Sequence, residues 1–166
     1  MQLNQIFKME FINAGLEAKN KDEVLAELVN VIIEGGLKLN SSSIIDILKQ
    51  RENLGSTGIG EGVAIPHGKI SNLNDIVVAF GRSEKGIAYD SLDGKPVHLF
   101  FLLLAPENSA GQHLKILAKI SKMLKDVYFR NKLIAAKSRD ELYQICLLYT
   151  SPSPRDRTRS RMPSSA

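Results

Sequence analysis

Two segments in the first third of the chain carry apolar residues at helical spacing. In the first, Asn20 and Glu23 form a capping-box pattern and Gly35 is a typical helix stop, which together predict a helix. Its apolar side is formed by Val24, Leu25, Leu28, Val31 and Ile32. Before this helix, the segment Phe11–Leu16 predicts a short strand.

The second helical segment follows Ser41–Ser43, which are predicted to cap its N-terminus. Its apolar side is formed by Ile44, Ile45, Ile47 and Leu48. Arg51 lies at the end of this helix, just before a glycine-rich stretch. The pattern places a permanent positive charge at the entrance to that stretch.

Three uninterrupted apolar runs in the middle of the chain predict buried strands, namely Val63–Ile65, Ile76–Gly81 and Val97–Leu104. Continuous runs are typical of strands that are covered on both faces, so a layered α/β domain is expected. Asp93-Gly94 marks a turn before the last run, and Pro106 is expected to end it.

Helical spacing returns after Asn108–Gly111, which opens a third predicted helix. A buried stripe is expected along it, formed by Leu114, Leu117, Ile120 and Leu124 and extended by Ile116 and Met123. A shorter helix is predicted over Tyr128–Ala136. Ser138 with Glu141 forms another capping box and predicts a last helix toward Ile145.

The composition is that of an ordinary globular protein of one domain, with 166 residues, 43% hydrophobic and 24% charged. The longest apolar run, Leu99–Ala105, is too short to span a bilayer, and the start of the chain lacks the pattern of a secretory signal. The single cysteine, Cys146, excludes an internal disulfide and fits a reducing compartment. A cytoplasmic protein without membrane insertion is predicted.

The chain changes character near its end, so we predict a folded domain over residues 1–146 and a separate tail over residues 147–166. The tail is rich in Ser, Pro and Arg and supplies most of the net charge of +4. Three interpretations stay open: a basic arm for nucleic acid or acidic lipid, a disordered end, and a non-native segment translated from linker or frame-shifted DNA. The last two are favoured, and no nucleic-acid partner is expected for the domain.

The candidate chemistry lies in Arg51–Ile70, where a run of glycines and the pair Ser56-Thr57 lead into Pro66 and His67. Glycine lets main-chain amides approach a ligand closely, and histidine is a nucleophile that accepts phosphoryl groups. Pro66 restricts the residue before it to an extended conformation and so fixes the entry to His67. This combination predicts handling of a phosphoryl group.

Other classes of site are disfavoured. Val63 stands where a dinucleotide fingerprint needs its third glycine, the chain has no GxxxxGK[ST], and Ser56 lacks a GxSxG elbow. His67, His98 and His113 lie far apart in the sequence without a cysteine cluster, so no metal site is predicted. His98, within an apolar strand, is expected to be structural.

The string R-E-x-x-x-S-T-G-I-G-x-G-x-A-I-P-H-G resembles the phosphorylation-site signature of the type 2 enzyme IIA domain of the bacterial phosphoenolpyruvate-dependent sugar phosphotransferase system. This group contains the fructose and mannitol domains and their nitrogen-regulatory relatives. The resemblance continues through DSLDGKPVHLFFLLLAPENSAGQHLKILAKISKML and, more loosely, through KSRDELYQI, and it covers about residues 5–145.

The resemblance implies a phosphoryl relay from the phosphohistidine of the carrier protein HPr to a cysteine of enzyme IIB. His67 matches the histidine that the family phosphorylates, and His113 and Arg51 match the other two members of its active site. Loop hydroxyls and amides are expected to orient this histidine or to hold the phosphate. They belong to Ser56, Thr57, Gly58 and Gly60.

Because a phosphohistidine donor and a cysteine acceptor are both reactive, neither a metal nor a cofactor is expected. The expected fold is a single α/β domain with a central mixed β-sheet flanked by helices on both faces, a three-layer sandwich. The first functional hypothesis is sugar uptake of the fructose or mannitol type. The alternative is a nitrogen-regulatory protein whose phosphorylation state controls its partners. No oligomeric state is predicted.

Overall fold

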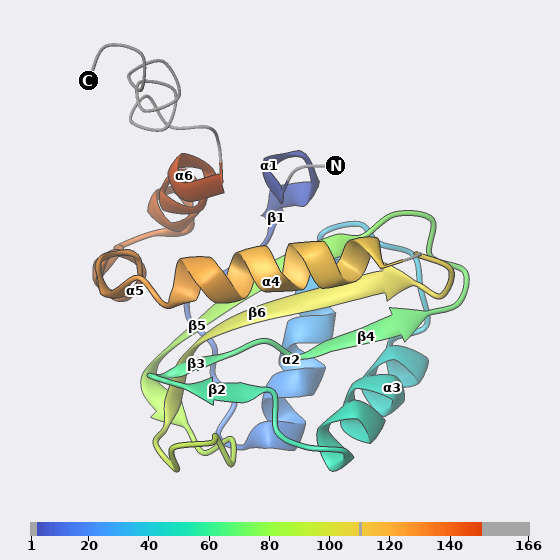
Figure 1. The fold of residues 1–166 in the computed structure, drawn as a ribbon, viewed down its shortest axis with the longest axis horizontal. Coiled ribbons are helices and arrows are strands. Elements are labelled where there is room, and N and C mark those ends of the chain that lie inside the picture. Colours follow the sequence, from blue (N-terminus) through green and yellow to red (C-terminus); the bar gives the residue numbers. More distant parts are fainter. Residues whose placement is uncertain (1–2, 110, 151–166) are drawn as a thin grey trace, which may run out of the picture.

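The computed structural model describes residues 3–109 and 111–150, which form a six-stranded mixed sheet between two layers of helices (Figure 1). The strand order is β1-β5-β6-β3-β2, and β4 also pairs with β6. The strands are β1 (Phe7–Asn13), β2 (Gly58–Gly60), β3 (Val63–Ala64), β4 (His67–Ile70), β5 (Val77–Ile87) and β6 (Val97–Pro106). The predicted three-layer α/β sandwich is confirmed.

Helices cover both faces of this sheet (Figure 1). One face is covered by α2 (Lys21–Glu34) and α3 (Ser41–Asn53). The other is covered by α4 (Gln112–Leu124), α5 (Val127–Ala135) and α6 (Arg139–Thr150), with the short α1 (Leu3–Ile6) beside α6. In the described part of the chain, no helix is long and apolar enough to cross a membrane.

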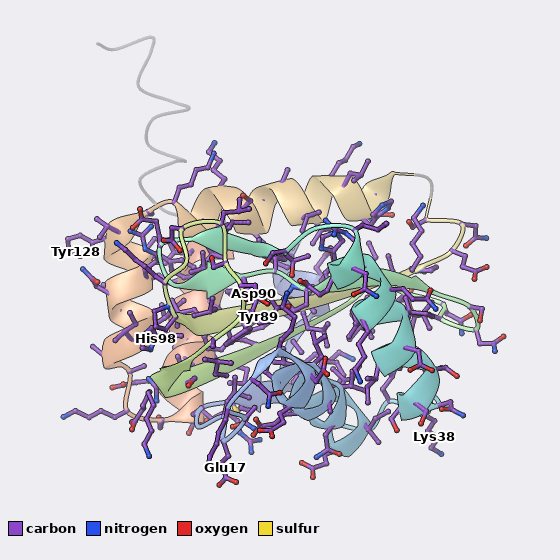
Figure 2. All side chains as sticks on the ribbon, turned by 90° about the horizontal axis from the view of Figure 1, so that it is seen from below. Glu17, Lys38, Tyr89, Asp90, His98 and Tyr128 are labelled. Atoms are coloured by element: carbon purple, nitrogen blue, oxygen red, sulfur yellow. The ribbon has the colours of Figure 1, made fainter. Side chains whose placement is uncertain are left out.

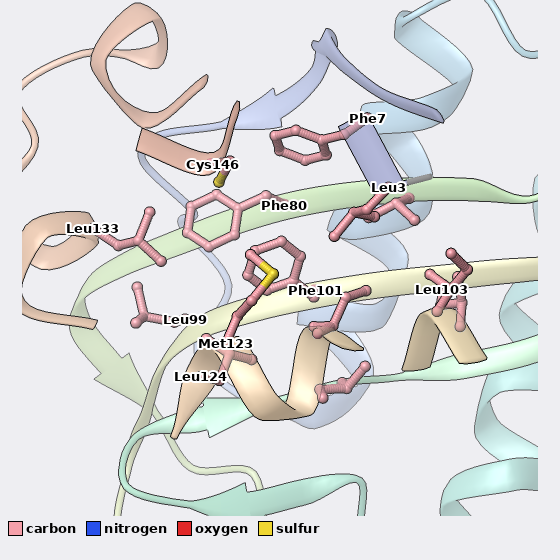
Figure 3. Close-up of a cluster of buried hydrophobic side chains, with 14 of the residues drawn as sticks. Leu3, Phe7, Phe80, Leu99, Phe101, Leu103, Met123, Leu124, Leu133 and Cys146 are labelled. Atoms are coloured by element: carbon pink, nitrogen blue, oxygen red, sulfur yellow. The ribbon is translucent and has the colours of Figure 1, made fainter. Parts of the chain in front are cut away.

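The central strand β6 is buried on both faces, which explains its continuously apolar sequence. Leu99, Phe101 and Leu103 belong to the core beneath α4, α5 and α6 (Figure 3). The alternate side chains belong to the core beneath α2 and α3, namely Phe100, Leu102 and Leu104. Successive side chains of a strand point to opposite faces, so this one run supplies two cores. Burial of each such side chain contributes about 1.5–3 kcal/mol.

The predicted helix boundaries that depend on capping are confirmed for α2 and α6. The side chain of Asn20 accepts a hydrogen bond of 2.9 Å from the amide of Glu23, and α2 ends at Gly35. At α6, the hydroxyl of Ser138 accepts a hydrogen bond of 3.1 Å from the amide of Glu141. Local side chains therefore fix where these helices begin.

Two predictions in the N-terminal half are wrong in their details. The N-cap of α3 is Asn40, whose side chain accepts from the amide of Ser43, so Ser41–Ser43 lie inside the helix. The first strand is Phe7–Asn13 rather than Phe11–Leu16, and its start alternates buried and exposed side chains. A strand with one solvated face at its start escapes a search for continuous apolar runs.

The predicted stripe of α4 is corrected at its first turn. Ile116, Ile120 and Leu124 are buried, but the side chain of Leu114 is 58% exposed. Two residues along a helix turn the side chain by about 200°, so Leu114 faces away from the side that Ile116 buries.

The last helix continues beyond residue 146, the predicted end of the folded domain, to Thr150. The ring of Tyr149 lies with its centroid 4.5 Å from that of Phe129 in α5. The rest of the predicted tail, residues 151–166, lies outside the described residues. Charged side chains elsewhere project at the rim of the molecule, as Figure 2 shows for Glu17 and Lys38.

Candidate functional site

A cleft of about 630 Å³ opens where the end of α3, strand β4, the end of β6 and the start of α4 meet. It brings together Arg51, His67 and His113, which the sequence analysis assigned to one site. Its other lining residues are Ile47, Gln50, Leu54, Gly68, Lys69, Leu103, Ala105 and Glu107. A cavity of about 740 Å³ beside Lys8, Lys38 and Asn72 has no histidine among its lining residues, so the chemistry favours the first cleft.

Residues on both sides of His67 hold its backbone in place. The amide of Ile65 donates to the carbonyl of Thr57 at 3.0 Å, and the amide of Leu103 in β6 donates to the carbonyl of Pro66 at 3.0 Å. Pro66 has no amide hydrogen and separates β3 from β4, which both pair with β6. His67 thereby begins β4 with its side chain at the cleft.

The imidazole of His67 has a defined tautomer. Its Nδ1 lies 2.7 Å from the carbonyl oxygen of Ile65. A carbonyl only accepts hydrogen bonds, so Nδ1 carries the hydrogen and Nε2 has a free lone pair. Burial lowers the pKa of His67, and the charges of Arg51 and His113 lower it further, although the bond to Ile65 and the charge of Glu52 act in the opposite direction. His67 is therefore neutral at pH 7, with the lone pair of Nε2 available.

His113 lies in the first turn of α4, half-buried at the same cleft. Its Nδ1 is 2.8 Å from the hydroxyl oxygen of Ser109. Burial lowers the pKa of His113, and the positive charge of Lys69 lowers it further. Lys69 is two residues after His67 on β4, so the two side chains point to the same face of the strand.

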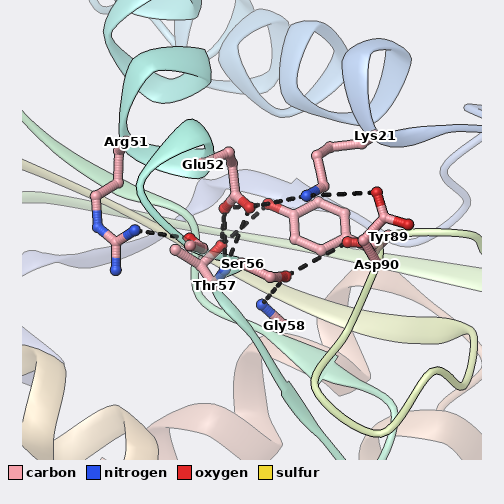
Figure 4. Close-up of polar contacts among 9 residues, drawn as sticks. Lys21, Arg51, Glu52, Ser56, Thr57, Gly58, Tyr89 and Asp90 are labelled. Carbon is pink, nitrogen blue, oxygen red and sulfur yellow. Dashed lines mark hydrogen bonds and ion pairs between the residues drawn. The ribbon is translucent and has the colours of Figure 1, made fainter.

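Arg51 reaches the cleft from the last turn of α3. Its Nη1 donates a hydrogen bond of 2.8 Å to the carbonyl of Gly55, as Figure 4 shows. A guanidinium has five hydrogen-bond donors, so this contact orients the group and leaves other donors for an anion. The positive charge is near enough to His67 to lower its pKa.

The predicted phosphate-orienting residues are not among the residues that line the cleft: Ser56 and Thr57 lie in the loop after α3, and Gly58 and Gly60 lie in β2. The hydroxyl of Ser56 accepts from the amide of Gly58 at 3.0 Å, and the amide of Gly60 donates to the hydroxyl of Ser91 at 3.1 Å. The hydroxyl of Thr57 donates to Glu52. All four residues therefore make hydrogen bonds within this segment, to α3 or to the β5–β6 connection.

The sequence analysis missed the buried carboxylate of Glu52. It accepts hydrogen bonds from the amide of Thr57 and from the hydroxyl of Tyr89, the latter at 2.9 Å, and pairs with Nζ of Lys21 at 3.1 Å (Figure 4). Burial raises the pKa of Tyr89, so its hydroxyl stays a donor. Glu52 follows Arg51 directly, and this cluster ties the end of α3 to α2 and to the β5–β6 connection. The available signal for Glu52 in the sequence was its place directly after Arg51, as the E of the R-E pair that opens the signature string.

His98 is held in the sheet, away from the cleft. Its Nδ1 lies 2.9 Å from the carbonyl oxygen of Ser83 in β5. Across the described ranges 3–109 and 111–150, no group of three or more His, Cys, Asp or Glu side chains is placed to hold a metal ion.

The family described as "Phosphoenolpyruvate-dependent sugar phosphotransferase system, EIIA 2" matches residues 5–148. The chain belongs to this family. It is an EIIA-type phosphocarrier, a phosphoryl-transfer component of that system, and the resemblance seen in the sequence is confirmed.

Relatives of this EIIA protein carry two kinds of name. It is 38% identical to a nitrogen regulatory protein of Bradyrhizobium diazoefficiens, over 89% of this chain and 96% of that protein. It is 36% identical to the fructose-specific EIIABC component of Bacillus subtilis over 87% of this chain, but it spans only 23% of that protein. The crystal structure of the nitrogen regulatory protein IIA-Ntr of Neisseria meningitidis superposes with a TM-score of 0.80 and 34% identity, covering 86% of this chain and 97% of that one.

Proposed function

We propose that this EIIA protein accepts a phosphoryl group on Nε2 of His67 from the phosphohistidine of an HPr-like carrier and passes it to a cysteine of an enzyme IIB. The observation that carries the proposal is the bond from Nδ1 of His67 to the carbonyl of Ile65, which leaves the Nε2 lone pair in a cleft shared with Arg51 and His113. The proposed location of this reaction is the cytoplasm.

The relay has two balanced steps. In the first, the Nε2 lone pair of His67 attacks phosphorus, the nitrogen–phosphorus bond of the donor breaks, and the donor histidine leaves with that electron pair. In the second, the thiolate of the enzyme IIB cysteine attacks phosphorus, the Nε2–phosphorus bond breaks, and His67 returns to the neutral state. Neither step needs a metal or a cofactor.

Phosphoryl transfer depends on in-line positioning and on compensation of charge on the three equatorial oxygens. Arg51 is the proposed electrostatic stabiliser, because its guanidinium is permanently charged and donates in a fixed plane. His113 is the proposed second donor to the phosphoryl oxygens. Both line the cleft at His67, and both contribute to the lowered pKa of that histidine.

The proposed physiological role is sugar uptake of the fructose or mannitol type. Its support is the relative named as a fructose-specific EIIABC component, in which EIIA, EIIB and EIIC form one protein. A nitrogen-regulatory role is the second candidate, because the chain is 38% identical to one nitrogen regulatory protein and superposes on another with a TM-score of 0.80. In that role, phospho-His67 controls the binding of partner proteins.

The test uses the full chain with phosphoenolpyruvate, enzyme I and HPr, and measures acid-labile phosphate by intact mass. We expect one phosphoryl group on the wild type and none on His67→Ala. Arg51→Ala and His113→Ala should be labelled about 10²-fold more slowly, since each removes a preorganised donor to the transferring group. Arg139→Ala, a change at an exposed arginine outside the cleft, is the matched control.

Label that persists on His67→Ala would overturn the assignment of the phosphorylated residue. Transfer from phosphorylated protein to an isolated enzyme IIB then separates the two roles. Rapid transfer supports sugar uptake, whereas a stable phospho-form that gains or loses a protein partner supports regulation.

A further inference from the structure

Ser109 lies in the turn that joins β6 to α4, beside the cleft. Its backbone is fixed on both sides, since its amide donates to the carbonyl of Pro106 and its carbonyl accepts from the amide of Gln112, each at 3.1 Å. Its half-buried hydroxyl oxygen lies 2.8 Å from Nδ1 of His113. The turn therefore fixes both ends of the serine–histidine contact.

The same turn is tied to the strand that bears His67. Ile70 pairs with Pro106, and His67 pairs with Leu103, in the parallel register of β4 and β6. The turn that carries Ser109 thus follows directly on a strand pair that also sets the position of His67.

The distance between Ser109 and His113 does not by itself give the direction of the hydrogen bond, because a hydroxyl can donate or accept. With Nδ1 engaged by Ser109, Nε2 is the nitrogen left for the cleft. If Nδ1 carried the hydrogen, Nε2 would present a lone pair to phosphoryl oxygens in the cleft, which are acceptors only. If the hydroxyl donates to Nδ1, Nε2 carries the hydrogen and serves as a donor.

We propose that Ser109 is a positioning residue whose hydroxyl donates to Nδ1 of His113 and holds the tautomer whose Nε2–H meets the phosphoryl group on His67. This rests on the proposed function of His67 as the phosphoryl acceptor. The two imidazoles then hold opposite tautomers: the carbonyl of Ile65 keeps the hydrogen of His67 on Nδ1, and the hydroxyl of Ser109 keeps that of His113 on Nε2.

The tautomer itself is measured without phosphate, by nitrogen NMR of the full chain with ¹⁵N-labelled histidine at pH 8. For His113 we expect the ¹⁵N chemical shift of Nδ1 to be that of an unprotonated ring nitrogen and the shift of Nε2 to be that of a protonated one. Ser109→Ala should move both signals toward the average of two exchanging tautomers, and Ser109→Thr should restore them. Ser71→Ala, at an exposed serine in the loop after β4, is the control and should leave them in place.

The kinetic arm measures phosphoryl transfer from phosphorylated HPr. Ser109→Ala should slow transfer about fivefold, the effect of losing one neutral hydrogen bond, and should lower the melting temperature by only a few degrees, because the same bond is present in the free protein. His113→Gln replaces the imidazole by a side-chain amide whose NH₂ group lies near the position of Nε2. This amide is always a donor, because it has no second nitrogen to which the hydrogen could move. In that background Ser109→Ala should have no further effect, which is a double-mutant test of coupling.

A hydrogen on Nδ1 of His113 in the wild type, or an unchanged tautomer in Ser109→Ala, would overturn the role of Ser109. So would an equal slowing by Ser109→Ala in the wild-type and His113→Gln backgrounds. Failure of the wild type to take up phosphate at all is a different result, because it would overturn the function of His67 while the NMR experiment still reports the tautomer.

Discussion

Gly68 of β4 lies against Ile47 of α3 so closely that a Cβ atom on Gly68 would fall 2.9 Å from Cγ2 of Ile47. The glycine thus lets the helix that carries Arg51 approach the strand that carries His67. The candidate site depends on this approach, since α3 and β4 both contribute residues to the cleft.

Gly68→Ala should therefore impair both stability and phosphorylation. We expect a loss of about 1–3 kcal/mol in the free energy of unfolding from the overpacked contact. The rate of phosphoryl uptake should fall as well, since the shift of α3 moves Arg51 away from His67. Urea unfolding and the labelling rate measure the two effects.

Gly15→Ala is the matched control for Gly68→Ala, because nothing lies within 4 Å of the added Cβ there. The double variant Gly68→Ala/Ile47→Ala removes the overlapping methyl group and should recover part of the labelling rate. No recovery, together with normal folding, would show that the approach of α3 to β4 does not limit the reaction.

The stability of the protein should depend on pH through His67. Burial lowers its pKa below the ordinary value of about 6.5 that it has in the unfolded chain. Between these two pKa values the unfolded state binds more protons, so the free energy of unfolding falls as pH is lowered through this window. At about pH 7.5 and above the histidine is neutral in both states and contributes no slope.

The titration has a direct measurement and a control. NMR of the His67 ring protons should give a midpoint below that of a free histidine, and His67→Ala should reduce the loss of stability on acidification from about pH 7 to pH 5.5. His113→Ala is measured in parallel, because the pKa of His113 is also lowered. A His67 midpoint above about 6.5 would contradict the described environment, which includes Arg51, Glu52 and His113.

Glu52→Gln should destabilise the protein by about 1.5–3 kcal/mol, the range for hydrogen bonds to a charged group. The amide removes the negative charge that faces Lys21 and turns a donor toward the donors of Thr57 and Tyr89. Asp46→Asn, at an exposed carboxylate on the same helix, is the control and should change the unfolding free energy little. Equal effects of the two changes in urea unfolding would contradict the structural role of this cluster.

Arg82→Met should also destabilise strongly, by about 3 kcal/mol, because it leaves buried carbonyl groups without a donor. The guanidinium of Arg82 in β5 donates to Leu133 at 2.9 Å and to Ala136 at the end of α5, and its Nε donates to Ala14 at 3.1 Å. Lys85→Met, at an exposed position of the same strand, is the control. If thermal unfolding shows no difference between them, α5 is not anchored through Arg82.

Much of the fold could be predicted because its signals act over a few residues. The capping residues Asn20 and Ser138 lie three positions before the amides that they bind, and Pro106 is the last residue of its strand. The start of β1 was missed because its alternating pattern looks polar. Leu114 was assigned to the core because it fits the apolar character of its helix, although it faces outward.

The residues of the candidate site also fall into two groups, those that neighbouring residues identify and those whose partners are distant along the chain. His67 was identified by its own neighbours, since Pro66 and the glycine-rich segment act on it directly along the chain. Thr57 looked equally available, yet its hydroxyl faces inward to Glu52, and its second partner Tyr89 is far along the sequence. No local pattern specifies such a partner.

The sequence by itself determined the helices, the buried strands and the histidine that is the candidate for phosphorylation, because capping, periodicity and proline geometry are properties of neighbouring residues. Tertiary structure alone decided that Arg51 and His113 meet His67 in one cleft, and that Ser109 reaches the ring of His113. Those contacts depend on the pairing of β4 with β6 and on the packing of α3 against β4, which join segments that are distant along the chain.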